Sequence, residues 1–196
     1  IMQSIDKCIM ELNITIKDIE LIATGIGPGS FTGIRIAVTT TRMLAQLTKS
    51  QVIGVKSQEI YAASTQAAPG ENILIAFDAK KNRVFGSLYK NDSDNKPKAI
   101  VEPGDYPISE LVTAIPDNNK TLLIGDGISM YYESIIGYKK NIRIDNSFRP
   151  DGKKICDYIQ FVAQQNPENI QNYNELVPFY ARKSDAEIMK ELKKST

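Results

Sequence analysis

The glycine-rich stretch from Ile22 to Ile36, with the sequence IATGIGPGSFTGIRI, limits what this chain can fold into more than any other segment. It begins as an apolar strand, passes through a turn rich in glycine and continues as an amphipathic helix. A helix that starts directly after a strand presents unpaired backbone N–H groups, so such corners often hold ligands. The stretch therefore predicts an α/β fold with a candidate site at this corner.

The spacing of the glycines excludes the two commonest phosphate-binding loops. A dinucleotide-binding GxGxxG loop needs a third glycine where this chain has Ser30. A Walker-type loop needs a lysine and a hydroxyl residue where the chain has Ile34 and Arg35. A weak anion site at the start of the helix stays open as an alternative. We predict a structural turn with the motif residues Gly27, Pro28, Gly29, Ser30, Thr32 and Arg35.

The helix that follows the turn, over residues 30–48, carries a stripe of small residues beside a bulky apolar one. Gly33 costs this helix roughly 0.5–1 kcal/mol relative to alanine, which indicates a contact too close for a Cβ. One side of the helix is expected to face its own sheet, and the other to face either another helix of this chain or a partner protein.

The order of the elements predicts a first α/β lobe over residues 1–68. Strands over 19–24 and 52–55 flank the helix over 30–48, which is the pattern of a parallel pair joined by a right-handed crossover. The Ala-Ala-Pro-Gly segment at 67–70 is the expected boundary with the next lobe.

Residues 69–196 are predicted to form a second α/β lobe. It opens with a β-hairpin whose turn lies at 80–82, and it includes a helix over 152–164 that Pro167 ends. A capping box at 184–187 predicts a C-terminal helix that closes this lobe.

Composition argues against several kinds of site. The 196 residues include 24 basic and 23 acidic side chains, so charge alone predicts no polyanionic partner. The chain has no histidine, which removes the commonest metal ligand and the usual base of serine and cysteine hydrolases. Cys8 and Cys156 lack metal-ligand spacing and are expected to be reduced thiols of a cytoplasmic protein. We predict no catalytic residue, no metal, no cofactor and no membrane segment.

Two charged residues outside the turn are further candidates. Asp78 ends a predicted strand, where it caps a turn or, alternatively, binds a metal or activates water. Arg182 is expected to form a structural ion pair, for example with Glu187, or else to reach a partner or a phosphate.

Several motifs of the chain resemble those of the TsaB (YeaZ) family. The segment GPGSFTGIRI at 27–36 is similar to the family signature. In the same order as in the family, the chain also has similar segments at 53–55, 77–81, 124–127 and 178–182. The resemblance covers nearly the whole chain, and the combination of motifs is specific.

The resemblance implies a two-lobe ASKHA (actin/Hsp70-like) fold and a role in making N6-threonylcarbamoyladenosine at adenosine 37 of tRNA. Family members are non-catalytic partners that form a heterodimer with TsaD and assemble with the ATPase TsaE, while TsaC supplies the activated threonylcarbamoyl group. ATP is used by the partner subunits, and tRNA is met only through the complex. The docking surface of the family uses the first two helices. In this chain the resemblance therefore implies a partner interface made of Met2, Ile5, Ile9, Phe31, Gly33, Ile34, Ala37, Thr40, Thr41 and Leu44. A homodimer is expected through the same surface when TsaD is absent.

The chain departs from the family pattern in two places. The family begins with a β-hairpin and a third strand that carries a D-T-S-type turn; no such segment precedes Ile1, so the first lobe is expected to lack its initial strands. Arg83 stands where many relatives carry an acidic residue. The remaining alternatives are a stand-alone ATP-binding phosphotransferase or ATPase of this fold, and a peptidase.

Overall fold

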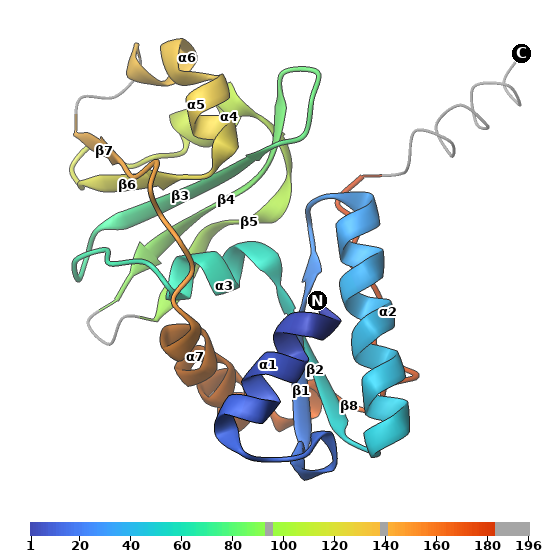
Figure 1. The fold of residues 1–196 in the computed structure, drawn as a ribbon. Coiled ribbons are helices and arrows are strands. Elements are labelled where there is room, and N and C mark those ends of the chain that lie inside the picture. Colours follow the sequence, from blue (N-terminus) through green and yellow to red (C-terminus); the bar gives the residue numbers. More distant parts are fainter. Residues whose placement is uncertain (93–95, 138–140, 183–196) are drawn as a thin grey trace, which may run out of the picture.

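A computed structural model describes residues 1–92, 96–137 and 141–182, which form two β-sheets with their own helices (Figure 1). The first sheet has the strand order β1-β2-β8, and the second has the order β5-β4-β3-β6-β7. Helix α3 (Ser57–Ala63) lies between them, because its side chains reach the cores of both sheets. The predicted α/β class is confirmed.

The first sheet is built on the crossover that the sequence predicts. β1 (Leu21–Gly27) leads through α2 (Phe31–Thr48) to β2 (Gln51–Lys56), which runs parallel to β1. The strand extends farther than expected, through Thr24 to Gly27, since its glycines still pair with the end of β2. The sheet is completed by β8 (Ile170–Gln171), which is antiparallel to β2.

Helix α1 (Met2–Leu12) and the short 3-10 helix η1 (Ile16–Asp18) precede this sheet. Asn13 ends α1 in the left-handed conformation, with a φ of 52°. Thr15 and Asp18 form the reciprocal hydrogen bonds of a capping box around η1. None of the residues of α1 is buried.

The second sheet begins with the predicted hairpin. β3 and β4 are antiparallel, and the turn between them places Lys80, Lys81 and Asn82 at positive φ values of 64°, 55° and 58°. β4 pairs antiparallel with β5, whereas β6 and β7 extend the sheet in parallel on the other side of β3. The strand bounds are β3 Asn72–Asp78, β4 Arg83–Asn91, β5 Pro97–Pro107, β6 Thr121–Ile124 and β7 Ile142–Ile144.

Helices cover both faces of the second sheet. α4 (Ile108–Thr113), α5 (Asp126–Met130) and α6 (Tyr132–Ile136) pack on one face, around a core that includes Leu88 and Leu111. α3 and the loop after it pack on the other face, where Ala62 and Ala67 contact buried residues of β3, β4 and β6. Strand residues alternate between these two cores, as the period of two requires.

The chain returns to the first sheet after β7, which differs from the predicted boundary. Helix α7 (Gly152–Gln165), which we expected in the second lobe of 69–196, packs against Ile53 and Val55 of β2. The reason is that these two side chains leave an apolar face of β2 opposite α2, and the apolar side of α7 covers it. The 3-10 helix η2 (Pro167–Asn169) and β8 follow. The predicted C-terminal helix that begins at the capping box at 184–187 lies outside the described residues.

Candidate protein-docking surface on the first two helices

The corner between β1 and α2 depends on Gly27. Its φ of 114° is a conformation that side chains with a Cβ rarely adopt. A Cβ at this position would collide with the carbonyl oxygen of Phe179 and would lie 2.8 Å from Cδ1 of Ile34. Glycine is therefore required here by both backbone conformation and close packing.

Three hydrogen bonds from distant segments hold the corner. The N–H of Gly27 donates to Ser57 Oγ at 3.2 Å, and Gln58 Nε2 donates to the carbonyl of Pro28 at 3.2 Å. On the other side, the N–H of Phe179 donates to the carbonyl of Ile26 at 2.8 Å. The start of α3 and the chain around Phe179 thus fix the direction in which α2 leaves the sheet.

The motif residues at the start of α2 contact one another and the C-terminal segment. Ser30 is the N-cap, and its Oγ accepts from the N–H of Gly33 at 3.3 Å. The Phe31 ring stacks on Tyr180 with 4.9 Å between centroids, and the Arg35 guanidinium lies 4.0 Å from the Phe31 centroid. Arg35 Nε also donates to the Tyr180 hydroxyl at 3.0 Å. Phe31 is therefore packed within the chain. Gly29 is half-buried and Thr32 is exposed.

One side of α2 is buried against the first sheet. Ile34, Val38, Thr41 and Ala45 face β1 and β2, at spacings of three and four residues. Ile34 and Thr41, two of the predicted interface residues, are only 6% exposed. We therefore assign them to the core, because they lie on the same helical face as Val38.

The opposite side of α2 presents large apolar residues to solvent. Ile36 is 50% exposed, Met43 58% and Leu47 77%. These residues and Thr40 follow a spacing of four, three and four, so they lie on one face. The α2 apolar face, as we call it, consists of Gly33, Ile36, Ala37, Thr40, Met43, Leu44 and Leu47.

The predicted partner interface includes four residues of this face and omits three. Ala37, Thr40 and Leu44 are half-buried and Gly33 is exposed. The omitted Ile36, Met43 and Leu47 were visible in the same helical periodicity. The small-residue stripe lies along one edge of the face, and these three larger residues lie beside it.

Gly33 is not explained by packing within the described chain. A Cβ built there would meet the Ser30 side chain at 3.5 Å, which is an ordinary van der Waals contact. The sequence-based expectation of a contact too close for a Cβ is thus wrong for these residues. A glycine with open space above it, on an exposed apolar face, leaves room for the backbone of another helix.

Helix α1 adds a second apolar surface. Met2 is 48% exposed, while Ile5 and Ile9 are half-buried. Met10 and Leu12 are 78% and 67% exposed. Among the described residues, none of α1 belongs to the hydrophobic cores that the two sheets form with their helices. Apolar side chains exposed at this level on two neighbouring segments are typical of interaction surfaces.

A separate cavity of about 490 Å³ lies between the corner and the β3–β4 turn. Asp78 in its wall accepts hydrogen bonds from the N–H of Lys80 at 2.8 Å, from its ammonium at 2.5 Å and from the Tyr131 hydroxyl at 3.1 Å. The Lys80 ammonium holds the pKa of Asp78 below its usual range. Asp78 thus caps the turn, as one of its two predicted roles required.

Arg182, in the same cavity wall, takes part in contacts within the chain. Its Nη1 donates to the carbonyl of Ala79 at 3.4 Å, and its Nε lies 3.9 Å from a carboxylate oxygen of Asp105. Arg83 shares that carboxylate, with Nε donating at 2.9 Å. Arg182 therefore has the predicted structural ion pair, with Asp105 as its partner. Glu187 lies outside the described residues.

Comparison with known proteins agrees with this architecture. The model of the family described as "TsaD: tRNA N6-adenosine threonylcarbamoyltransferase" matches residues 1–189. A protein of Buchnera aphidicola subsp. Schizaphis graminum, named "tRNA threonylcarbamoyladenosine biosynthesis protein TsaB", is 29% identical over 178 residues, 85% of this chain and 77% of its own length. The Bacillus subtilis protein of the same name is 24% identical over 190 residues, 95% of this chain and 80% of its own length.

The chain belongs to this family, in its TsaB (YeaZ) branch. Two solved structures share the fold. YeaZ from Pseudomonas aeruginosa superposes with a TM-score of 0.76 at 22% identity, over 90% of this chain and 80% of that one. A protein described as having similarity to peptidase YEAZ from Pseudomonas aeruginosa gives 0.77 at 21% identity, over 91% and 81%. The predicted ASKHA fold is confirmed by this likeness.

Metal and membrane sites were also considered. Among residues 1–92, 96–137 and 141–182, no group of three or more carboxylate or cysteine side chains could hold a metal ion. Within the same ranges, none of the helices has the length and apolar character needed to cross a membrane.

Proposed function

We propose that this protein is a non-catalytic partner subunit in the biosynthesis of threonylcarbamoyladenosine in tRNA, and that it docks TsaD through the α2 apolar face. The observation that carries the proposal is the exposure of Ile36, Met43 and Leu47 on a helix whose start is clamped at the corner. The names of the curated relatives supply the biosynthetic role.

The chemistry of the face suits another helix. Gly33, Ala37 and Thr40 are small, so a partner backbone can approach closely, while Met43 and Leu47 can fill grooves between its side chains. Burying a side chain of this size contributes about 1.5–3 kcal/mol. A few such anchors at the centre of an interface usually dominate its affinity. The exposed apolar residues of α1 can extend the contact.

The same face can serve a homodimer. An isologous interface brings one patch against its own copy, so a helix face with both small and bulky residues can be complementary to itself. We propose that the homodimer and the heterodimer with TsaD compete for the α2 apolar face. TsaE then joins the TsaD-bound form, and tRNA is met through the complex.

A non-catalytic role is supported by what the chemistry-bearing residues do. The carboxylate of Asp78 caps a turn, and Arg182 is engaged with Ala79 and Asp105 in the cavity between the lobes. The chain has no histidine to act as a base. We propose that ATP is used by the partner subunits and that this chain needs no cofactor.

The docking proposal is tested by placing a charge on the α2 apolar face. Met43→Glu adds a carboxylate to the α2 apolar face at an exposed position, so it should leave folding unchanged. We expect TsaD binding, measured by titration calorimetry, to weaken at least about tenfold, since a buried unpaired charge costs more than 1.4 kcal/mol. Gln46→Glu is the matched control, because Gln46 is exposed on the polar side of the same helix. Equal affinities of the two variants would contradict the docking proposal.

The biosynthetic role is tested by reconstitution. Purified TsaC, TsaD and TsaE should modify tRNA much faster with this chain than without it, and Met43→Glu should lose most of that gain. A rate that does not respond to the chain would overturn the assignment. Tight ATP binding or ATP hydrolysis by the chain alone would instead favour the phosphotransferase alternative.

A further inference from the structure

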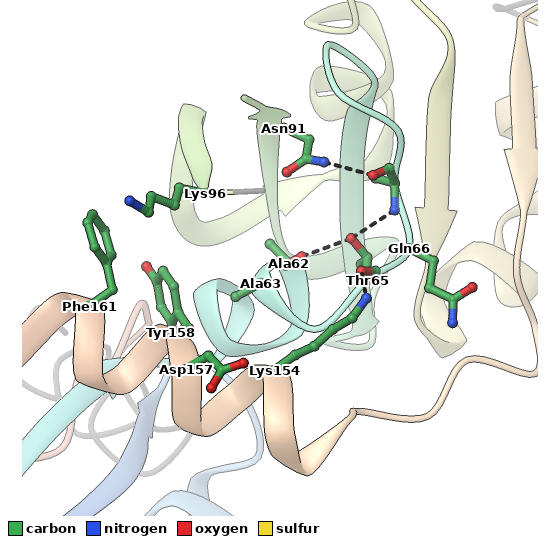
Figure 2. Close-up of a pocket in the computed structure, with 11 residues that line it drawn as sticks. Ala62, Ala63, Thr65, Gln66, Asn91, Lys96, Lys154, Asp157, Tyr158 and Phe161 are labelled. Atoms are coloured by element: carbon green, nitrogen blue, oxygen red, sulfur yellow. Dashed lines mark hydrogen bonds between the residues drawn. The ribbon is translucent and has the colours of Figure 1, made fainter. Parts of the chain in front are cut away.

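A second cavity, of about 460 Å³, lies between α7 and the end of α3, on the opposite face of the first sheet from α2. Figure 2 shows the side chains that line it. One wall is the face of α7 that carries Lys154, Tyr158 and Phe161. The opposite wall is the end of α3 and the loop after it, and the rim is formed by Asn91 and Lys96 beside the β4–β5 connection. Its volume falls in the range of about 300–1,000 Å³ typical of small-molecule sites.

Two aromatic side chains contribute most of the apolar character of this cavity. The rings of Tyr158 and Phe161 are neighbours on α7, with centroids 6.5 Å apart and planes 37° apart. The lining also includes Ala63, which is half-buried, and Ala62 and Ala67, which are buried in the core of the second sheet. The two rings offer a surface that suits a planar group, because aromatic faces stack on one another in offset geometry.

The polar part of the cavity is rich in donors. Lys96 Nζ lies 4.0 Å from the Phe161 centroid, and Lys154 Nζ donates to the carbonyl of Thr65 at 2.7 Å (Figure 2). Neither ammonium forms an ion pair with a carboxylate in the described part of the chain. Each ammonium has three donors, so both retain hydrogen-bonding capacity. Burial raises the pKa of the Tyr158 hydroxyl.

Asp157 is the carboxylate among the described residues of the lining. It already accepts from Lys153 Nζ at 2.8 Å, and both side chains are largely exposed. The cavity thus keeps two half-buried cations of its own, whose attraction for an anion is screened less than at an open surface.

We propose that this cavity binds an organic anion of mononucleotide size, with a planar ring against Tyr158 and Phe161 and a phosphate within reach of Lys96 or Lys154. The ring packs against the two aromatic side chains, and the phosphate oxygens accept from ammonium donors that form no ion pair in the described part of the chain. The site lies on the opposite face of the first sheet from the α2 apolar face and does not depend on the proposed function.

The test is a titration of the full chain with adenosine 5′-monophosphate, followed by amide chemical shifts. We expect saturable shifts in residues 62–67 and 154–161. Adenosine, which lacks the phosphate, and ribose 5-phosphate, which lacks the ring, should each bind at least about tenfold more weakly, since a charge-assisted hydrogen bond contributes about 1.5–3 kcal/mol. Absence of saturable binding, shifts centred on Arg182 in the other cavity, or equal binding of either fragment would overturn the proposal.

Variants then locate the site. Lys96→Met should weaken binding of adenosine 5′-monophosphate about tenfold, whereas Lys98→Met, the same charge change at an exposed position of β5, should change it less than about twofold. Ala63→Leu places a larger side chain in the cavity without altering charge and should abolish binding. Equal effects of the two lysine variants, or unchanged binding in Ala63→Leu, would contradict the assignment.

Discussion

Replacing Gly27 with alanine should destabilise the chain more than any other glycine-to-alanine change at the corner. A backbone with a φ of 114° costs a residue that has a Cβ about 1–3 kcal/mol. The new methyl also collides with the Phe179 carbonyl and lies 2.8 Å from Ile34 Cδ1, so the C-terminal segment must move. That movement disturbs the 2.8 Å hydrogen bond from Phe179 to Ile26, which contributes about 1 kcal/mol. We expect a total loss of about 2–4 kcal/mol in the free energy of unfolding.

Urea unfolding followed by far-ultraviolet circular dichroism measures this loss, with the slope against urea held as a check on two-state behaviour. Gly29→Ala is the matched control two residues away, because no heavy atom lies within 4 Å of the Cβ it would gain. The control should change stability by less than about 0.5 kcal/mol. A value for Gly27→Ala within about 1 kcal/mol of the wild-type chain would refute the account of the corner given above.

Three further changes test other features. Gly33→Ala should raise the free energy of unfolding by roughly 0.5–1 kcal/mol, because the added Cβ meets only an ordinary van der Waals contact. The same variant should weaken TsaD binding in calorimetry. Arg143→Met should cost about 1–2 kcal/mol at pH 7, because the Glu71 side chain, 5% exposed, loses its partner. The Arg143 guanidinium lowers the pKa of Glu71. In urea unfolding, the loss of stability in Arg143→Met should therefore be present above the ordinary pKa of a glutamate and should disappear as the pH falls through the lowered pKa of Glu71. Burial raises the pKa of Glu59, so Glu59→Gln should stabilise the chain at pH 7 by less than about 1 kcal/mol, and the gain should vanish at low pH.

The order of strands and helices in the first sheet was readable from local patterns. The glycine turn, the apolar run before it and the helical period after it predict β1, α2 and β2, because turn chemistry and side-chain period are properties of neighbouring residues. The hairpin of the second sheet could be predicted equally well, since its turn residues lie between two runs of strand-forming side chains.

The position of α7 could not be predicted from local patterns. Its periodicity predicts an amphipathic helix, but the residues that cover its apolar side, Ile53 and Val55, lie about a hundred positions earlier in the chain. Because α7 follows the strands of the second sheet in sequence, we expected it to pack there. It packs on the first sheet, because the apolar face of β2 opposite α2 is open to it. The local pattern predicts that the apolar face of a helix or strand is buried, but only the packing of the assembled sheets determines which residues bury it.

The corner at Gly27 shows the same division. The sequence alone determined that a tight turn joins a strand to a helix there, that it cannot be either of the common phosphate loops, and which residues of α2 share a face. Only the tertiary structure decided that Ile34 and Thr41 face the sheet, that Ile36, Met43 and Leu47 face solvent, and that the Phe179 carbonyl makes Gly27 irreplaceable. The physical reason is that helical geometry sets the angle between side chains, whereas burial is set by whatever packs against them from distant parts of the chain.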